Sequence, residues 1–316
     1  MKEKTPRNFY GLEDRYSAYS TSRVVLLPVP FDRTSTWMKG SRRGPRALLE
    51  ASRNLELYDI ETDSQVYMQS LYTAQPVRAW KPEGMVEKVK ARVARYIAHG
   101  KFTVVLGGEH TVSIGTIAAH AEHCGQMSVL QLDAHMDRRE FYQGSRYNHA
   151  CVMARVGEIV NTIVSVGIRS MDATERNQSD RRRPTRGRES LQGESPWESA
   201  RGATERSRLE GERVFFAHDC FESNQYIEHI PSLLKDPVYI TIDLDVFDPG
   251  IMSSTGTPEP GGLGWYEVIN LLRSVTESRR VVGFDVVELC PSRNKAPDFL
   301  AAKLVYKLLS FIFQRG

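Results

Sequence analysis

Residues 238–249 read VYITIDLDVFDP, a pattern from which much of the fold class can be inferred. Its first five residues form a largely apolar run without polar alternation, which is typical of a strand buried on both faces of a parallel sheet. Carboxylates follow at once, at Asp243, Asp245 and Asp248. Because ligands of open α/β sheets gather at the carboxyl ends of the strands, the stretch predicts a buried strand with a polar site at its end.

Similar runs recur along the chain and alternate with amphipathic stretches. The predicted strands are Val24–Val29, Phe102–Leu106, Met127–Leu132, Thr162–Gly167, Arg213–Ala217, Val238–Ile242 and Val281–Val286. The predicted helices are Gly44–Ser52, Met85–Ala98, Thr111–His123, Ser223–Leu234, Gly264–Glu277 and Pro297–Phe313. This alternation predicts an α/β fold, a three-layer α/β/α sandwich around a mainly parallel sheet. We expect a single domain over residues 1–316.

The composition is close to that of an average globular protein. The 316 residues include 42 Lys plus Arg and 39 Asp plus Glu, a net charge of +3, which gives no general argument for a nucleic-acid or membrane partner. No apolar run approaches the roughly 18 residues of a membrane span, and no signal peptide is visible. The four cysteines are far apart and form no CxxC pair. We therefore expect reduced thiols and a cytoplasmic protein.

One segment interrupts the alternation. From Thr174 to Arg213 there are ten Arg, seven Glu and one Asp, with only three large apolar residues. Because so few apolar residues cannot offset the entropy of ordering, we predict a disordered Arg-rich surface insertion at residues 174–212. Ten Arg against eight acidic residues leave only +2, which favours a solvated loop over an RNA-binding segment. A reading-frame error in the source gene would leave the same break in composition.

Further polar clusters stand at the ends of other predicted strands. They are GGEH at residues 107–110, DAHMD at residues 133–137, and Glu288. The acidic and histidine residues of DAHMD are spaced i, i+2, i+4, which places them on one face of an extended chain. Carboxylates and imidazoles that converge in this way repel one another and resist desolvation unless a cation binds.

The clusters together offer four carboxylates and two imidazoles, without a thiolate. The candidate metal ligands are His110, Asp133, His135, Asp137, Asp243 and Asp245. This donor set favours Mn²⁺ over structural zinc, with Mg²⁺, Fe²⁺ and Co²⁺ as alternatives. Six ligands are too many for one tetrahedral ion and suit two ions that share bridging carboxylates. We therefore expect two Mn²⁺ per subunit.

These motifs resemble those of the ureohydrolase family, which contains arginase, agmatinase, guanidinobutyrase and formimidoylglutamase. GGEH resembles the family's GG(D)H, DAHMD its DAHxD, and TIDLDVFDP its SxDxDxxDP, although Glu109 and Thr241 replace the usual Asp and Ser. The resemblance runs from about Val24 to the C-terminus, outside the insertion, and implies an arginase-like fold. It also implies one manganese ion held by His110, Asp133, Asp137 and Asp243, and a second held by His135, Asp133, Asp243 and Asp245.

The resemblance implies three catalytic residues. Glu288 matches the family's substrate-binding Glu, and a planar carboxylate pairs well with a planar guanidinium. His149 matches the family's proton-shuttling His, and a histidine titrates in a range that suits this task. Asp137 counts as a catalytic residue as well as a ligand. His218 and Asp248 are expected to be structural, the latter by stabilising the loop ahead of Pro249.

The resemblance is closest to agmatinase, through TSTW at residues 34–37, NHACVM at 148–153 and GTPEPGG at 256–262. We therefore expect agmatine to be hydrolysed to putrescine and urea by a homo-oligomer, a trimer or hexamer, without a nucleic-acid or membrane partner. Arg138, Arg139 and Arg146 could instead pair with an acidic substrate tail. The alternatives are thus guanidinobutyrate, formiminoglutamate, aminopropylagmatine or arginine as substrate, or a non-catalytic metal-binding homologue.

Overall fold

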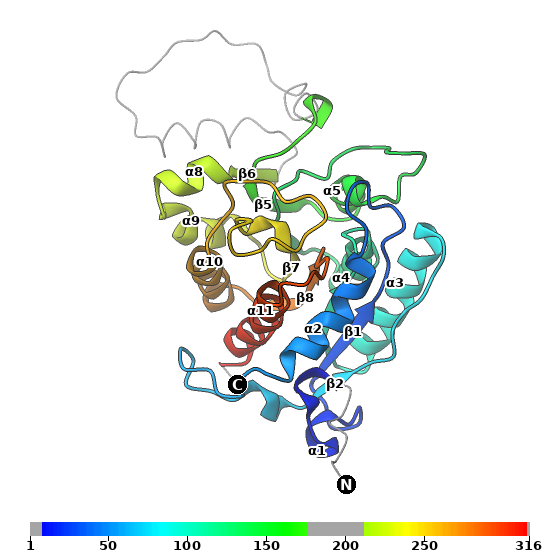
Figure 1. Cartoon of the computed structure of the whole chain (residues 1–316), viewed down its shortest axis with the longest axis vertical. Helices are drawn as coiled ribbons and strands as arrows, with labels where there is room; N and C mark the ends of the chain where they lie inside the picture. Colours follow the sequence, from blue (N-terminus) through cyan, green and yellow to red (C-terminus); the bar gives the residue numbers. More distant parts are fainter. Residues whose placement is uncertain (1–7, 176–211, 315–316) are drawn as a thin grey trace.

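A sheet of eight parallel strands runs through the part of the chain that the computed structural model describes, residues 8–175 and 212–314 (Figure 1). The strands are β1 (Val24–Val29), β2 (Leu71–Thr73), β3 (Phe102–Gly107), β4 (Ser128–Leu132), β5 (Thr162–Ile168), β6 (Glu212–Phe216), β7 (Val238–Asp243) and β8 (Val281–Val287). Their order across the sheet is β2-β1-β3-β8-β7-β4-β5-β6. The predicted parallel sheet is confirmed.

Helices cover both faces of this sheet, which gives the predicted three layers (Figure 1). One layer contains α2 (Gly44–Ser52), α9 (Gln225–Leu233), α10 (Trp265–Ser278) and α11 (Ala296–Phe313). The other contains α3 (Pro82–Ala98), α4 (Val112–Cys124) and α5 (Val152–Val156). The short helices α1 (Asp14–Ser17) and α8 (Ala217–Glu222) lie outside these two groups. No described helix has both the length and the apolar character needed to cross a membrane.

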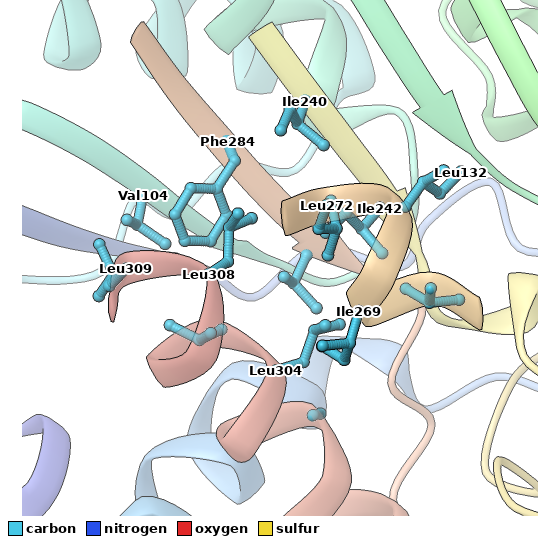
Figure 2. Close-up of a cluster of buried hydrophobic side chains, with 14 of the residues drawn as sticks. Val104, Leu132, Ile240, Ile242, Ile269, Leu272, Phe284, Leu304, Leu308 and Leu309 are labelled. Atoms are coloured by element: carbon cyan, nitrogen blue, oxygen red, sulfur yellow. The ribbon is translucent and has the colours of Figure 1, made fainter. Parts of the chain in front are cut away.

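The alternating sides of the central strands fill two separate apolar cores. In β7, Ile240 and Ile242 pack toward α10 and α11, whereas Tyr239 belongs to the core beneath α3 and α4. Figure 2 shows the first of these cores, in which Phe284 of β8 and Ile240 of β7 lie beside leucines of α10 and α11. Because both faces are covered, a polar side chain on either face would be buried, which explains the unbroken apolar runs in the sequence.

The predicted strands and helices are present, with ends that differ by three residues or fewer. The structure adds β2, α1, α5 and α8, which are three to six residues long. The predicted end of one strand is wrong, since Ala217 is already the first residue of α8.

The predicted Arg-rich insertion lies almost entirely at residues 176–211, outside the described residues. Its second residue, Glu175, is described and is buried. The Glu175 carboxylate accepts hydrogen bonds from the backbone N–H of Arg138 (2.7 Å) and of Asp172 (2.6 Å). The disorder of the insertion and the single-domain organisation remain predictions.

Candidate metal centre

The candidate ligands lie at the carboxyl ends of four adjacent strands in the middle of the sheet. His110 follows β3, Glu288 follows β8, Asp243 ends β7, and the DAHMD motif (133–137) follows β4. These strands are neighbours in the order β3-β8-β7-β4, although they are far apart in the sequence. The sheet topology therefore brings together the motifs that the sequence places at strand ends.

Three carboxylates surround the buried His110 imidazole. Its Nδ1 lies 3.1 Å from Asp133 Oδ2, 3.0 Å from Asp137 Oδ2 and 3.6 Å from Asp243 Oδ2. His110, Asp133 and Asp137 can all direct one ligand atom at a common point. Separations of about 3 Å are those expected between ligand atoms that share one divalent cation at about 2.1 Å.

A second ligand group uses the other oxygen of Asp133. His135 Nδ1 lies 2.9 Å from Asp245 Oδ2 and 3.7 Å from Asp133 Oδ1. Asp133, His135 and Asp245 can likewise direct one ligand atom each at a common point. Asp133 thus faces both groups, as a bridging carboxylate must.

The hydrogen bonds on the side of the His110 ring away from the carboxylates determine which ring nitrogen carries the proton. Thr241 Oγ1 donates to the buried Asp285 carboxylate at 2.7 Å, so its oxygen accepts from His110 Nε2 at 2.9 Å. In the neutral ring this leaves Nδ1 without a proton, and that buried atom has no hydrogen-bond partner among the described residues. Burial lowers the pKa of His110, but without a metal ion the Asp133 and Asp137 carboxylates raise it well above its ordinary range, so that a proton takes the cation's place. A lone pair that faces three carboxylates needs a cation, and the residues therefore fit a bound metal ion.

Burial and mutual repulsion also oppose the simultaneous ionisation of these carboxyl groups. Burial, with the adjacent Asp133, raises the pKa of Asp137 to about 7. Burial and the charges of Asp245 and Asp133 raise the pKa of Asp243 far above its ordinary range. Divalent cations among these groups would allow them all to ionise, as the oxygen-rich donor set favours.

A pocket opens over this centre and contains both other predicted catalytic residues. It is lined by five of the six candidate ligands, by Glu288 and His149, and by the exposed Trp37 among others. The Glu288 carboxylate accepts the backbone N–H of His110 at 2.8 Å, and Glu288 has a φ of +65°, in the left-handed region. Such backbone strain is typical of functional sites, where the surrounding structure holds a side chain in place.

His149 is neutral at pH 7 in this environment. Burial is the main reason that its pKa falls to about 4, and His135 and His110 lower it further. The T-shaped contact with Tyr142, at 6.0 Å between ring centres, places a second aromatic ring beside it in the pocket.

Two residues that the sequence placed outside the chemistry are outside it here. His218 is three-quarters exposed, lies 3.3 Å from Asp219, and does not line the pocket. The Asp248 carboxylate accepts the backbone N–H groups of Gly250 (2.8 Å), Gly261 (3.0 Å) and Gly262 (3.2 Å). Asp248 therefore has the expected structural role, although the loop that it stabilises follows Pro249 rather than preceding it.

Sequence reasoning missed a residue that holds the second ligand group in place. Arg169 follows β5, and its guanidinium donates to the backbone carbonyls of Asp245 (2.5 Å), Glu259 (2.9 Å) and Gly167 (3.0 Å). The carboxylate of Glu259 in turn lies 3.7 Å from His135 Nε2. The available signal was a charged side chain directly after a fully buried strand.

A sequence profile of the arginase family matches residues 22–186 and 198–310, which is most of the chain. The chain belongs to the arginase family. It is 36% identical over 304 residues to an N(1)-aminopropylagmatine ureohydrolase of Thermus thermophilus, covering 95% of this chain and 93% of that protein. It is 34% identical over 316 residues to the enzyme of the same name from Synechocystis, covering 97% and 94%.

A solved structure gives the same assignment. The agmatine ureohydrolase of Thermoplasma volcanium superposes with a TM-score of 0.80 at 27% identity, over 94% of this chain and 92% of that one. The arginase-like fold is therefore confirmed, and the chain is a hydrolase of the ureohydrolase class.

Proposed function

We propose that this enzyme uses two Mn²⁺ ions to hydrolyse a linear cationic guanidino amine to urea and the free amine, with N(1)-aminopropylagmatine as the first candidate substrate. Two relatives of that name, at 36% and 34% identity, support this substrate. Agmatine, the substrate predicted from the sequence motifs, is the second candidate, supported by the similarity to the Thermoplasma agmatine ureohydrolase. The observation that carries the proposed chemistry is the pair of ligand groups that share Asp133.

The two ligand groups would hold the ions as the family resemblance implies. His110, Asp133, Asp137 and Asp243 would hold one ion, and His135, Asp133, Asp243 and Asp245 the other. Bound cations of this kind supply a strong nucleophile by lowering the pKa of a water molecule that they share. A strong nucleophile is needed because the carbon of a resonance-stabilised guanidinium is a poor electrophile.

The remaining steps fall to Glu288 and His149. The Glu288 carboxylate would orient the substrate guanidinium through a charge-assisted hydrogen bond. The same carboxylate already accepts a hydrogen bond from the backbone N–H of His110. His149, which lines the same pocket and is neutral before the reaction, would accept a proton from the attacking water and then give it to the departing amine. Both residues are needed for turnover but not for metal binding, which separates this proposal from a metal-binding homologue without activity.

The charges around the pocket favour a cationic substrate over an acidic one. Arg139 lines the pocket, and its guanidinium lies 3.4 Å from the carboxylate of Asp172. Arg146 lies 2.5 Å from Glu158, and Arg138 is buried. Neither Arg146 nor Arg138 lines the pocket. The arginines that could have held a substrate carboxylate are therefore engaged elsewhere or already paired.

Initial-rate measurements on the purified, Mn²⁺-loaded protein would test the proposal. Urea release would be followed for N(1)-aminopropylagmatine, agmatine, arginine and guanidinobutyrate, and formamide release for formiminoglutamate, with Asp133→Asn as the inactive control. We expect the highest kcat/KM for the first two. Turnover of an acidic substrate alone would overturn the substrate assignment. A lack of turnover with two metal ions bound would overturn the hydrolase proposal for these compounds.

We further propose that the enzyme works in the cytoplasm as a homo-oligomer, a trimer or hexamer. The family resemblance supports the assembly. All four cysteines are unpaired, which is typical of a reducing compartment. Light scattering on the purified protein would measure the number of subunits.

A further inference from the structure

A buried carboxylate next to the metal centre has a set of partners that the proposed chemistry does not explain. Glu109, fully buried, follows β3 and immediately precedes the ligand His110. Its Oε1 accepts from Thr34 Oγ1 (2.7 Å) and Thr111 Oγ1 (3.0 Å). Its Oε2 accepts from the backbone N–H groups of Thr34 (2.8 Å) and Ser35 (2.9 Å) and from Ser35 Oγ (3.1 Å).

These hydrogen bonds fix the segment at residues 34–35 against the strand end. The backbone supports the same approach, since Glu109 N–H donates to the carbonyl of Phe31 at 2.8 Å. A Cβ on Gly108 would lie 2.0 Å from that Phe31 oxygen, so only glycine allows the two segments to come so close. The Glu109 carboxylate and the close approach of Phe31 to Gly108 and Glu109 therefore hold the Thr34 side chain in one place.

The Thr34 hydroxyl links Glu109 to His149. A hydroxyl has one proton and two lone pairs, and Thr34 gives its proton to the Glu109 carboxylate, the closest acceptor at 2.7 Å. The oxygen then accepts the backbone N–H of His149 at 3.2 Å. It also lies 3.3 Å from His149 Nδ1, and with its own proton committed it can only accept there. Neutral His149 must therefore carry its proton on Nδ1, which leaves Nε2 as the nitrogen that gains and loses a proton.

The same arrangement occurs a second time in this site. Asp285 accepts from Thr241, and Thr241 accepts from His110, which sets the protonation of that metal ligand. In both cases a buried carboxylate takes the only proton of a threonine hydroxyl, and the hydroxyl oxygen then accepts from a histidine ring. Because the arrangement occurs twice, we infer that the use of a carboxylate-bound threonine to orient a histidine is a general feature of this site and is not peculiar to Thr34.

We propose that Thr34 and Glu109 are positioning residues that hold His149 in the Nδ1–H tautomer and in the orientation needed for proton transfer. This inference rests on the proposed function only in the role given to His149. The length of the Glu109 side chain is part of this proposal. An aspartate at this position would be one methylene shorter and would not extend to both residues 34 and 35.

Kinetics of Thr34→Val, which keeps the side-chain shape but removes the hydroxyl, would test the proposal. We expect kcat to fall roughly 10- to 100-fold, since general acid–base catalysis contributes about 10²–10⁴ in rate, with KM and bound Mn²⁺ unchanged. Thr34→Ser, which keeps the hydroxyl, should restore most of the rate. Thr103→Val is the matched control, because Thr103 makes a similar contact (3.0 Å) to His120, which does not line the pocket.

A double-mutant cycle separates positioning from a general structural effect. If Thr34 acts through His149, adding Thr34→Val to His149→Ala should cause no further loss of kcat. Additive losses, or a loss of metal in Thr34→Val or Glu109→Asp, would overturn the proposal.

The tautomer can also be measured without turnover. Nitrogen-15 NMR of the histidine rings in the Mg²⁺-loaded protein, assigned with His149→Asn, should show His149 protonated on Nδ1. Thr34→Val should shift it toward the Nε2–H form. An Nε2–H signal in the unaltered protein would overturn the inference even if every substrate were inactive, whereas Nδ1–H without turnover would count only against the proposed function.

Discussion

Asp133 belongs to both ligand groups of the metal centre, because each of its two oxygens faces one of them. Asp133→Asn should therefore weaken both ions, whereas Asp245→Asn should weaken mainly the ion beside His135. We expect apparent metal affinity to fall by more than about 100-fold in Asp133→Asn, since even losses around a ligand cost 10- to 100-fold. Metal analysis after equilibrium dialysis, together with urea release, would measure both effects.

Asp248→Asn provides the control for this comparison. Among the described residues, the Asp248 carboxylate accepts hydrogen bonds only from backbone N–H groups, so the Asp248→Asn variant should keep both ions. A full complement of metal in Asp133→Asn would contradict the shared role.

Six candidate ligands were found from sequence because they stand at short, regular spacings after apolar runs. Asp133, His135 and Asp137 need only the period of an extended chain to be placed on one face. Glu109 and Arg169 were not assigned a role, because their partners are distant in sequence. Glu109 binds residues 34 and 35, which lie 75 and 74 positions away, and no local pattern encodes that pairing.

A separate prediction concerns β7, where the hydroxyl of Thr241 orients the His110 ring. Thr241→Val in β7 removes the hydroxyl that accepts from His110 Nε2. We expect metal affinity to fall 10- to 100-fold with the fold retained, which isothermal titration with Mn²⁺ would measure. Thr276→Val in α10 is the matched control, since within the described part of the chain the Thr276 hydroxyl donates only to carbonyls of its own helix. Equal affinities in the two variants would contradict the proposed support.

Helix α4 should make the protein sensitive to acid through His120. Burial lowers the pKa of this histidine to about 4, and its Nδ1 donates to the carbonyl of Thr116 at 2.8 Å. Because the unfolded chain binds a proton near pH 6.5, stability is complete above that pH and declines as the pH falls toward 4, by about 3 kcal/mol in all.

Urea unfolding between pH 7 and pH 4 would measure this decline. His120→Asn should lose less stability than the unaltered protein over that window. The exposed His123 lies on the same helix, so His123→Asn should behave like the unaltered protein. An identical decline in all three would show that His120 does not contribute.

Long elements were predictable and short ones were not, for a physical reason. Helices such as α3 and α11 have enough turns for a periodic apolar face to be visible in the sequence. Strand β2 has three residues and α8 has six, too few for any period to be read. Tertiary pairing with β1, rather than local preference, makes Leu71–Thr73 a strand.

At the scale of the whole molecule, metal and stability should be linked. Cations bind the folded arrangement of carboxylates, which does not exist in the unfolded chain. One site at a hundredfold excess of metal over its Kd adds about 2.7 kcal/mol, or roughly 5 °C in Tm. Thermal unfolding in EDTA should thus occur at lower temperature than in MnCl₂, while Asp133→Asn should respond little to EDTA. Identical melting of the unaltered protein in both buffers would count against a metal centre here.

The order of the central strands has a consequence for how this chain is made. Strands β7 and β8 lie between β3 and β4, yet the ribosome releases them last, after residues 133–237 have followed β4. Until then, β3 and β4 each have an unpaired inner edge, the kind of surface that recruits foreign strands. Asp243 and Asp245 are also still unmade at that point. A nascent chain halted before Val238 should therefore need a chaperone, and it cannot assemble the full ligand set until Asp243 and Asp245 have been added.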